Sequence, residues 1–109
     1  AEPLLRRALK ASESVNNFGR LLKDMGKHRE AEPLLRRNLK AREETLGYDH
    51  PSTMMIVNEL GQLLTDMGRH QEAYPLLRRA LMDMEKSLGP EHPRTLRSVN
   101  QLGQMLQEL

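Results

Sequence analysis

Apolar residues recur along this 109-residue chain at the spacing of helix faces. The segment Thr53–Asp66 carries four of them at i, i+3, i+4 and i+7: Val57, Leu60, Gly61 and Leu64. The segment Ala73–Leu88 shows the same period. No window alternates apolar and polar residues as a half-buried strand does. The pattern therefore predicts an all-α fold.

The ends of these helices carry recognisable signals. Asp49, His50 and Pro51 supply polar capping groups and a proline near the first turn of the helix that follows. Gly68 ends that helix at a position where a glycine can adopt a positive φ. A glycine and a proline, Gly89 and Pro90, stop the next one. We call the Thr53–Asp66 type helix A and the Ala73–Leu88 type helix B.

The sequence also repeats itself. AEPLLRR at Ala1–Arg7 returns at Ala31–Arg37, and AYPLLRR follows at Ala73–Arg79. The step from Ala31 to Ala73 also relates His50 to His92, and we call it the repeat period. A fixed period of this length predicts a stacked array of helix pairs. We expect a single array fragment cut from a longer one, divided into a truncated first unit (1–29), a full unit (30–71) and a full unit lacking its end (72–109).

The first two copies of the motif are closer together than one repeat period. The first copy lacks a counterpart of Arg42–Thr53, the segment that contains the glycine and the proline. Six helical segments in the order B-A-B-A-B-A are predicted, and the first two are expected to fuse into one helix from about Glu2 to about Met25. The alternative is a simple solenoid with a short turn at Ser12–Ser14.

A fused first helix B cannot fold back on its own helix A, so its apolar face lacks a partner within the chain. The outer face of the last helix A is left in the same state, and exposed apolar patches of this kind favour association. Self-association is therefore expected through residues of the two end helices, with a closed dimer or an open filament as the product. These residues are Leu4, Leu5, Ala8, Leu9, Leu102 and Leu106.

The run Asn58–Thr95 contains four motifs in order: N-x-L-G-x-L-L, M-G-[KR]-H, E-A-x-P-L-x-R-R and LG followed by HP and T. With these motifs the chain resembles, over its whole length, the long tetratricopeptide repeat of the kinesin-light-chain and nephrocystin type. The resemblance implies a helical-hairpin solenoid in which helix A lines a concave surface that holds an extended peptide. In that family the asparagines matching Asn16, Asn58 and Asn100 face the cargo groove. The alternative is that these asparagines form hydrogen bonds only within the array.

Some positions carry residues that helices usually avoid. Glycines stand in mid-helix at the same phase in three helices A, at Gly19, Gly61 and Gly103, which implies close helix approach. The small residues expected to face them are Ala31, Ala73 and Ala80, whereas Asn38 breaks this pattern and marks either looser packing or a polar contact. Pro33 and Pro75 lie early in helix B, either within its opening turn or at a bend.

Composition narrows the function. The formal net charge is +2, and the chain has no cysteine, no apolar run of membrane-spanning length and no signal-peptide core. The absence of cysteine does not fix the compartment, and an intracellular, cytoplasmic location is an expectation only. No catalytic motif or acid/base pair is present, so neither an enzyme nor a cofactor is predicted. His28, His50, His70 and His92 fall on opposite edges of the stack, which favours helix capping over a metal site.

The arginine pairs Arg6-Arg7, Arg36-Arg37 and Arg78-Arg79 recur on helix B, but interleaved glutamates and the absence of a base-stacking platform favour salt links over nucleic-acid binding. The leading prediction is a non-catalytic scaffold that binds a peptide or a partner helix on the concave helix-A surface. The residues off the apolar face that are expected to contact it are Asn16, Asn17, Arg20, Lys23, Asn58, Gln62, Asn100 and Gln104. Arg20 and Lys23 add a preference for an acidic ligand. The alternative is a self-associating structural module whose truncated first repeat drives assembly.

Overall fold

The protein is described by a computed structural model that covers residues 14–107. Within these residues it forms five helices and no strand, which confirms the all-α prediction. A first helix runs over residues 14–24. It is followed by α2 (His28–Leu46), α3 (Pro51–Asp66), α4 (His70–Leu88) and α5 (Pro93–Leu106).

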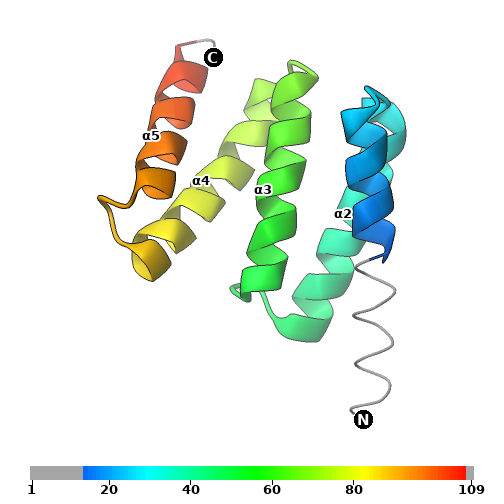
Figure 1. Cartoon of the computed structure of the whole chain (residues 1–109), viewed down its shortest axis with the longest axis horizontal. Coiled ribbons are helices and arrows are strands. Elements are labelled where there is room, and N and C mark those ends of the chain that lie inside the picture. The colour runs from blue at the N-terminus through cyan, green and yellow to red at the C-terminus, as the bar shows by residue number, and fades with distance from the viewer. Residues whose placement is uncertain (1–13, 108–109) are drawn as a thin grey trace.

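Each labelled helix packs against the next, so the chain forms a stack of antiparallel helices (Figure 1). The helix over residues 14–24, α3 and α5 are the helices A of the sequence analysis, and α2 and α4 are the helices B. The helix over residues 14–24 ends close to Met25, the end predicted for the fused helix. Its first half, Leu4, Leu5, Ala8 and Leu9 included, lies outside the described residues.

Helix α3 forms the centre of the hydrophobic core, because it is covered from two sides by α2 and α4. Its buried apolar side chains are at most 7% exposed: Met54, Ile56, Val57, Leu60, Leu63 and Leu64. Burial of this kind is the main favourable contribution to the stability of a helical stack.

Histidine side chains cap the two helices A that begin after a full-length link. The Nδ1 atoms of His50 and His92 accept hydrogen bonds from the backbone N–H groups of Ser52 and Arg94, at 3.1 Å in both cases. A proline follows each histidine at the first helical position, where no N–H is needed. The capping role predicted for these two histidines is therefore confirmed.

The link between α2 and α3 is closed by a buried threonine. The Thr53 hydroxyl donates to the carbonyl oxygen of Gly47 at 2.9 Å. Gly47 itself has a φ of 103°, a conformation that favours glycine. This hydrogen bond joins the first turn of α3 to the C-cap residue of α2.

Two of the mid-helix glycines mark a close approach between helices, but their neighbours differ from those predicted. A Cβ atom built on Gly19 would lie 3.2 Å from Leu35 Cδ2, and one built on Gly61 would lie 2.6 Å from Leu77 Cδ2. Each of these glycines therefore packs against a leucine and not against an alanine. The alanines Ala31, Ala73 and Ala80 are buried in the same core.

Each of the two helices B contains a proline just after its first turn. Helices α2 and α4 begin at His28 and His70, so Pro33 and Pro75 are the sixth residue of each helix and lie past the first turn. A proline at this position removes one backbone hydrogen bond near the N-terminal end of the helix. Asn38, the exception to the small-residue pattern, is 3% exposed and so is accommodated inside the stack.

Candidate functional site

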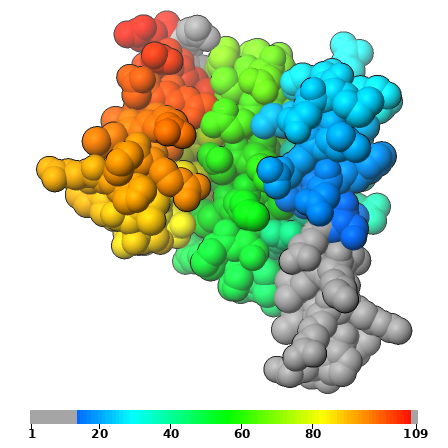
Figure 2. Space-filling model, in the orientation of Figure 1, coloured from blue at the N-terminus to red at the C-terminus, as the bar shows by residue number. Residues whose placement is uncertain are grey.

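One face of the molecule is formed by the three helices A, and we call it the A face. Figure 2 shows α3 on this side between the helix over residues 14–24 and α5. Four of the predicted peptide-contacting residues are exposed to solvent: Asn17, Arg20, Asn100 and Gln104. Three others are half-buried: Lys23, Asn58 and Gln62.

Two side-chain contacts across the A face are formed by residues at equivalent positions of successive repeats. Arg20 Nε lies 3.4 Å from Glu59 Oε1, and one repeat period later Gln62 Nε2 donates to Gln101 Oε1 at 2.9 Å. A charged pair between the first two helices A is thus replaced by a neutral amide pair between the next two. Both pairs hold adjacent units together, so Arg20 and Gln62 already have partners within the chain.

The three asparagines that recur at one phase do not share one environment. Asn16 is 3% exposed and hydrogen-bonds with the Glu59 side chain, so its amide lies under the surface and not on it. Asn58 is half-buried and Asn100 is exposed. Identical spacing in the sequence therefore leads to graded exposure, because each helix has different neighbours on either side.

Glu59 is a carboxylate on this face whose pKa is shifted by its surroundings. Burial raises its pKa above the ordinary value, while the charge of Arg20 and the hydrogen bond from Asn16 act in the opposite direction. Its Oε2 atom and the Oδ1 atom of Asn16 are both buried without a hydrogen-bond partner among the described residues. The contact between the first two helices A is therefore polar, and two of its buried oxygen atoms lack a hydrogen bond from the described part of the chain.

A small apolar pocket opens where α3, the end of α4 and the start of α5 meet. Its volume is about 320 Å³. Three methionines and a leucine provide most of its apolar wall: Met54, Met55, Met84 and Leu88. The polar residues Asn58, Asp83 and Arg94 also line it. Methionine side chains adapt easily to the shape of an apolar group, so the pocket suits a single apolar side chain of a partner.

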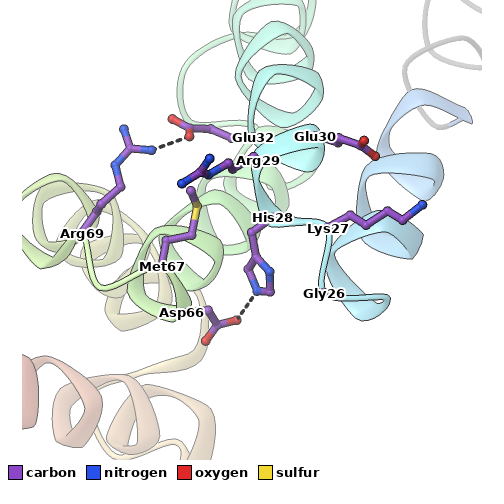
Figure 3. Close-up of a pocket in the computed structure, with 9 residues that line it drawn as sticks. All are labelled: Gly26, Lys27, His28, Arg29, Glu30, Glu32, Asp66, Met67 and Arg69. Carbon is purple, nitrogen blue, oxygen red and sulfur yellow. Dashed lines mark hydrogen bonds and ion pairs between the residues drawn. The ribbon is translucent and has the colours of Figure 1, made fainter.

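A larger hollow, about 810 Å³, lies instead at the turns between helix A and helix B (Figure 3). In Figure 3 the side chains of two pairs that line it point toward one another: His28 Nε2 is 3.8 Å from Asp66 Oδ2, and Arg69 donates to Glu32. Since both contacts join one helix pair to the next, we assign this hollow to unit-to-unit packing.

The same turns carry a closed network of four charged residues from two units. Arg69 binds Glu32 and Glu72, with Arg69 Nε and Glu72 Oε2 2.5 Å apart. Arg36 binds the same two carboxylates, at 2.8 Å and 3.4 Å. Burial acts to raise the pKa of Glu32, but the hydrogen bonds from Arg69 and Arg36 outweigh it and lower the pKa. The hydrogen bond from Arg69 lowers the pKa of Glu72.

The recurring arginines also serve contacts within the protein. Besides Arg36 in this network, Arg79 binds Glu43 Oε2 and the carbonyl oxygen of Tyr48, both at 2.9 Å, and its guanidinium stacks 3.4 Å from the centroid of the Tyr48 ring. These salt links agree with the interpretation that the sequence favoured for the arginine pairs.

Metal sites and membrane spans are not found in the described part of the chain. In residues 14–107 no group of three or more histidine or acidic side chains is arranged to hold a metal ion. Over the same range, no helix combines the length and the apolar character needed to cross a membrane.

Taken together, the antiparallel helix pairs and the constant repeat period define an all-α repeat protein. The family model for the tetratricopeptide repeat matches residues 11–81 and 52–109, so the chain belongs to that family. Tetratricopeptide repeats are protein–protein interaction scaffolds and typically have no catalytic activity. The kinesin-light-chain type predicted from the motifs is confirmed by similar solved structures.

One of these structures is a Podosopora anserina protein assigned as a kinesin light chain, with nearly identical TPR-like repeats. It is 30% identical to this chain with a TM-score of 0.72, over 88% of this chain and 46% of that one. A single-residue variant of the same protein matches at 29% identity and a TM-score of 0.72, over 88% and 45%. The chain thus spans less than half the length of these structures. No curated protein sequence matches it.

Proposed function

We propose that the chain binds an extended peptide segment of a partner protein along the A face. One apolar side chain of the peptide would occupy the pocket lined by Met54, Met55 and Met84, which we call the methionine pocket. The observation that carries this proposal is that a residue predicted to contact the peptide also lines the pocket. The sequence predicts Asn58 as a peptide contact, and Asn58 lines the pocket together with Met55, which is 49% exposed. Ligand pockets are commonly lined by apolar side chains together with a few polar groups that orient the ligand.

Amide side chains give further support to the binding of a peptide backbone. Asn58, Asn100 and Gln104 each carry a donor and an acceptor, and the last two are exposed to solvent. Such groups pair with the N–H and C=O groups of an extended chain whatever its side chains are. Arg20 is predicted to favour an acidic ligand, but its contact with Glu59 offsets much of its charge. We therefore propose that the pocket, and not charge, dominates selection.

The test begins with selection of binders from a displayed library of random peptides, followed by fluorescence titration of one selected peptide. Met55→Ser and Asn58→Ala are the test variants, because neither side chain is fully buried. We expect each to weaken binding about two- to tenfold, the range that corresponds to the loss of one hydrogen bond or of a partly buried apolar contact. Gln71→Ala, an exposed residue of α4 away from the pocket, is the control.

A selected peptide that binds both test variants as tightly as it binds the parent would contradict the proposed site. Circular dichroism of all three variants at the titration temperature shows whether each is folded. Weakened binding together with an unchanged spectrum is then attributable to the A face.

A second candidate function is self-association as a structural module. It is favoured by the apolar side chains that α5 exposes, since Leu96 is 51% exposed and Leu106 is 52% exposed. Leu106 belongs to the predicted self-association residues. Leu102, predicted with it, is only 7% exposed and lies in the core, so we propose Leu96 and Val99 in its place.

A further inference from the structure

The outer face of α5, formed by Leu96, Val99, Gly103 and Leu106, repeats a face that is buried elsewhere in the same chain. The residues one repeat period earlier are Met54, Val57, Gly61 and Leu64, and they lie in the core of the stack. In α5 the three apolar side chains of the face are 46% to 52% exposed. Figure 1 shows α5 at the edge of the stack.

Gly103 is the clearest sign that this face is shaped for a helix. Leucine side chains fill the space beside Gly19 and Gly61, but among the described residues no atom of another element lies within 4 Å of a Cβ atom built on Gly103. Glycine is disfavoured within a helix, and here no described neighbour uses the space that its missing side chain leaves. A leucine from another helix would fit beside Gly103 in the way that Leu77 fits beside Gly61.

The chain contains a third copy of the sequence that covers such a face. Residues 31–41 of α2 read AEPLLRRNLKA, and residues 1–11 read AEPLLRRALKA. The two segments differ at one position. In α2 the residue that meets a glycine of helix A is Leu35, and its counterpart in residues 1–11 is Leu5. The difference is Ala8 for Asn38, and alanine also stands at the matching position of α4, Ala80.

The helix over residues 14–24, at the opposite end of the described stack, also exposes apolar side chains whose counterparts in the next unit are buried. Phe18 and Leu21 are 55% and 54% exposed, although their counterparts one repeat period later, Leu60 and Leu63, are buried in the core. One end of the stack therefore has a face for a following helix B, and the other end has a face for a preceding one. Two different complementary faces on one molecule produce head-to-tail association.

We infer that residues 1–11 of a second copy of this chain cover the outer face of α5, with Leu5 beside Gly103. The inference rests on the second candidate function, self-association, and names its interface. Residues 1–11 lie outside the described part of the structure, so the assignment is carried by their sequence and by the two internal junctions that the structure contains. The proposed contact has the same chemistry as the contact between Gly61 and Leu77.

Sedimentation velocity over a hundredfold range of concentration tests the interface, with Gly103→Ala and Leu5→Arg as variants. Gly103→Ala adds one methyl group to the proposed contact but meets no described atom within the isolated chain. We expect it to weaken association about tenfold or more, as overpacking does in a close-packed interface. It should also raise the midpoint of thermal unfolding measured at a concentration where the chain is monomeric, because alanine stabilises a helix relative to glycine. Arg97→Ala, an exposed residue of α5 outside this face, is the matched control.

A mixture of the two variants separates this interface from any other. Gly103→Ala keeps residues 1–11 intact, and Leu5→Arg keeps the outer face of α5 intact. At a concentration where each variant alone is monomeric, an equimolar mixture is expected to form a two-chain species and nothing larger.

Association that survives Gly103→Ala unchanged would overturn the inference while leaving self-association in place. A parent chain that stays monomeric at every concentration would overturn both.

Discussion

Leu77 packs directly against Gly61, so closely that a Cβ atom on Gly61 would lie 2.6 Å from Leu77 Cδ2 and 2.8 Å from Leu77 Cγ. Leu77 is 4% exposed and has little room to move away. We expect Gly61→Ala to lower the free energy of unfolding by about 1–3 kcal/mol, although alanine is otherwise the better helix residue by about 1 kcal/mol. Urea denaturation measures the change.

The other two glycines of this series provide the controls. Gly19→Ala meets Leu35 at 3.2 Å, so its effect should be smaller than that of Gly61→Ala. Gly103→Ala, measured on the monomer, should stabilise the protein. If all three substitutions changed stability by the same amount, close approach of the helices would not be the reason for the glycines.

His50 should be replaceable only by a residue that also accepts a hydrogen bond. His50→Ala removes the acceptor for the N–H group of Ser52, and we expect a loss of about 1 kcal/mol in the free energy of unfolding, typical of a lost N-cap. His50→Asn keeps a side-chain acceptor and should cost much less. The same pair of substitutions at His92 should give the same order, because its contact with Arg94 has the same length. An equal loss for alanine and asparagine would argue against capping.

The network around Arg69 should make part of the stability depend on pH in one direction. The pKa values of Glu32 and Glu72 are lowered in the folded protein, so their ionised forms favour folding. This contribution is present above the ordinary carboxyl pKa, near 4.5, and is lost as the pH falls through the lowered values. Arg69→Gln should therefore destabilise the protein at pH 7, and the difference from the parent should shrink below about pH 4.

Added salt gives an independent check on this prediction, because exposed ion pairs are screened. The difference between the parent and Arg69→Gln at pH 7 should decrease as sodium chloride is added. A difference that persisted unchanged at low pH and at high salt would show that Arg69 contributes through packing instead.

Glu59 should respond to pH in the opposite direction. Its pKa is raised in the folded protein, so the ionised form disfavours folding at pH 7 and this cost disappears as the pH falls through the raised value toward the ordinary one. Glu59→Gln is expected to stabilise the protein at pH 7 by no more than about 1 kcal/mol, with the gain fading on acidification. Gln101, which stands at the equivalent position and pairs with Gln62, shows that an amide fits there. Thermal unfolding at pH 7 and pH 4 measures both values, and a loss of stability at pH 7 would contradict the prediction.

The sequence predicts the helices well because each carries local signals. The period of Val57, Leu60 and Leu64, the caps at His50 and His92, and the positive φ of Gly68 (76°) all depend on residues close together in the chain. The resemblance of the motifs to one repeat type added the stacking of the helices, which the period alone leaves unspecified.

The candidate site was less predictable, because it depends on contacts between units. Asn16 and Asn100 stand at the same repeat phase, yet one is buried and the other exposed, since they face different neighbours. The burial of Leu102 and the pairing of Arg20 with Glu59 have the same origin. A comparison of each α5 residue with the residue one repeat period earlier would have found the exposed face of α5, because the earlier residues are buried.

The burial of α3 on both sides also orders the events of unfolding. A helix at the edge of the stack loses few contacts when it opens, whereas α3 cannot open until α2 or α4 has moved. Fraying should therefore start at α5, whose glycine has no described neighbour, and proceed inward. Amide hydrogen exchange would then record a gradient along the chain, with the slowest exchange in the backbone of Ile56–Leu64.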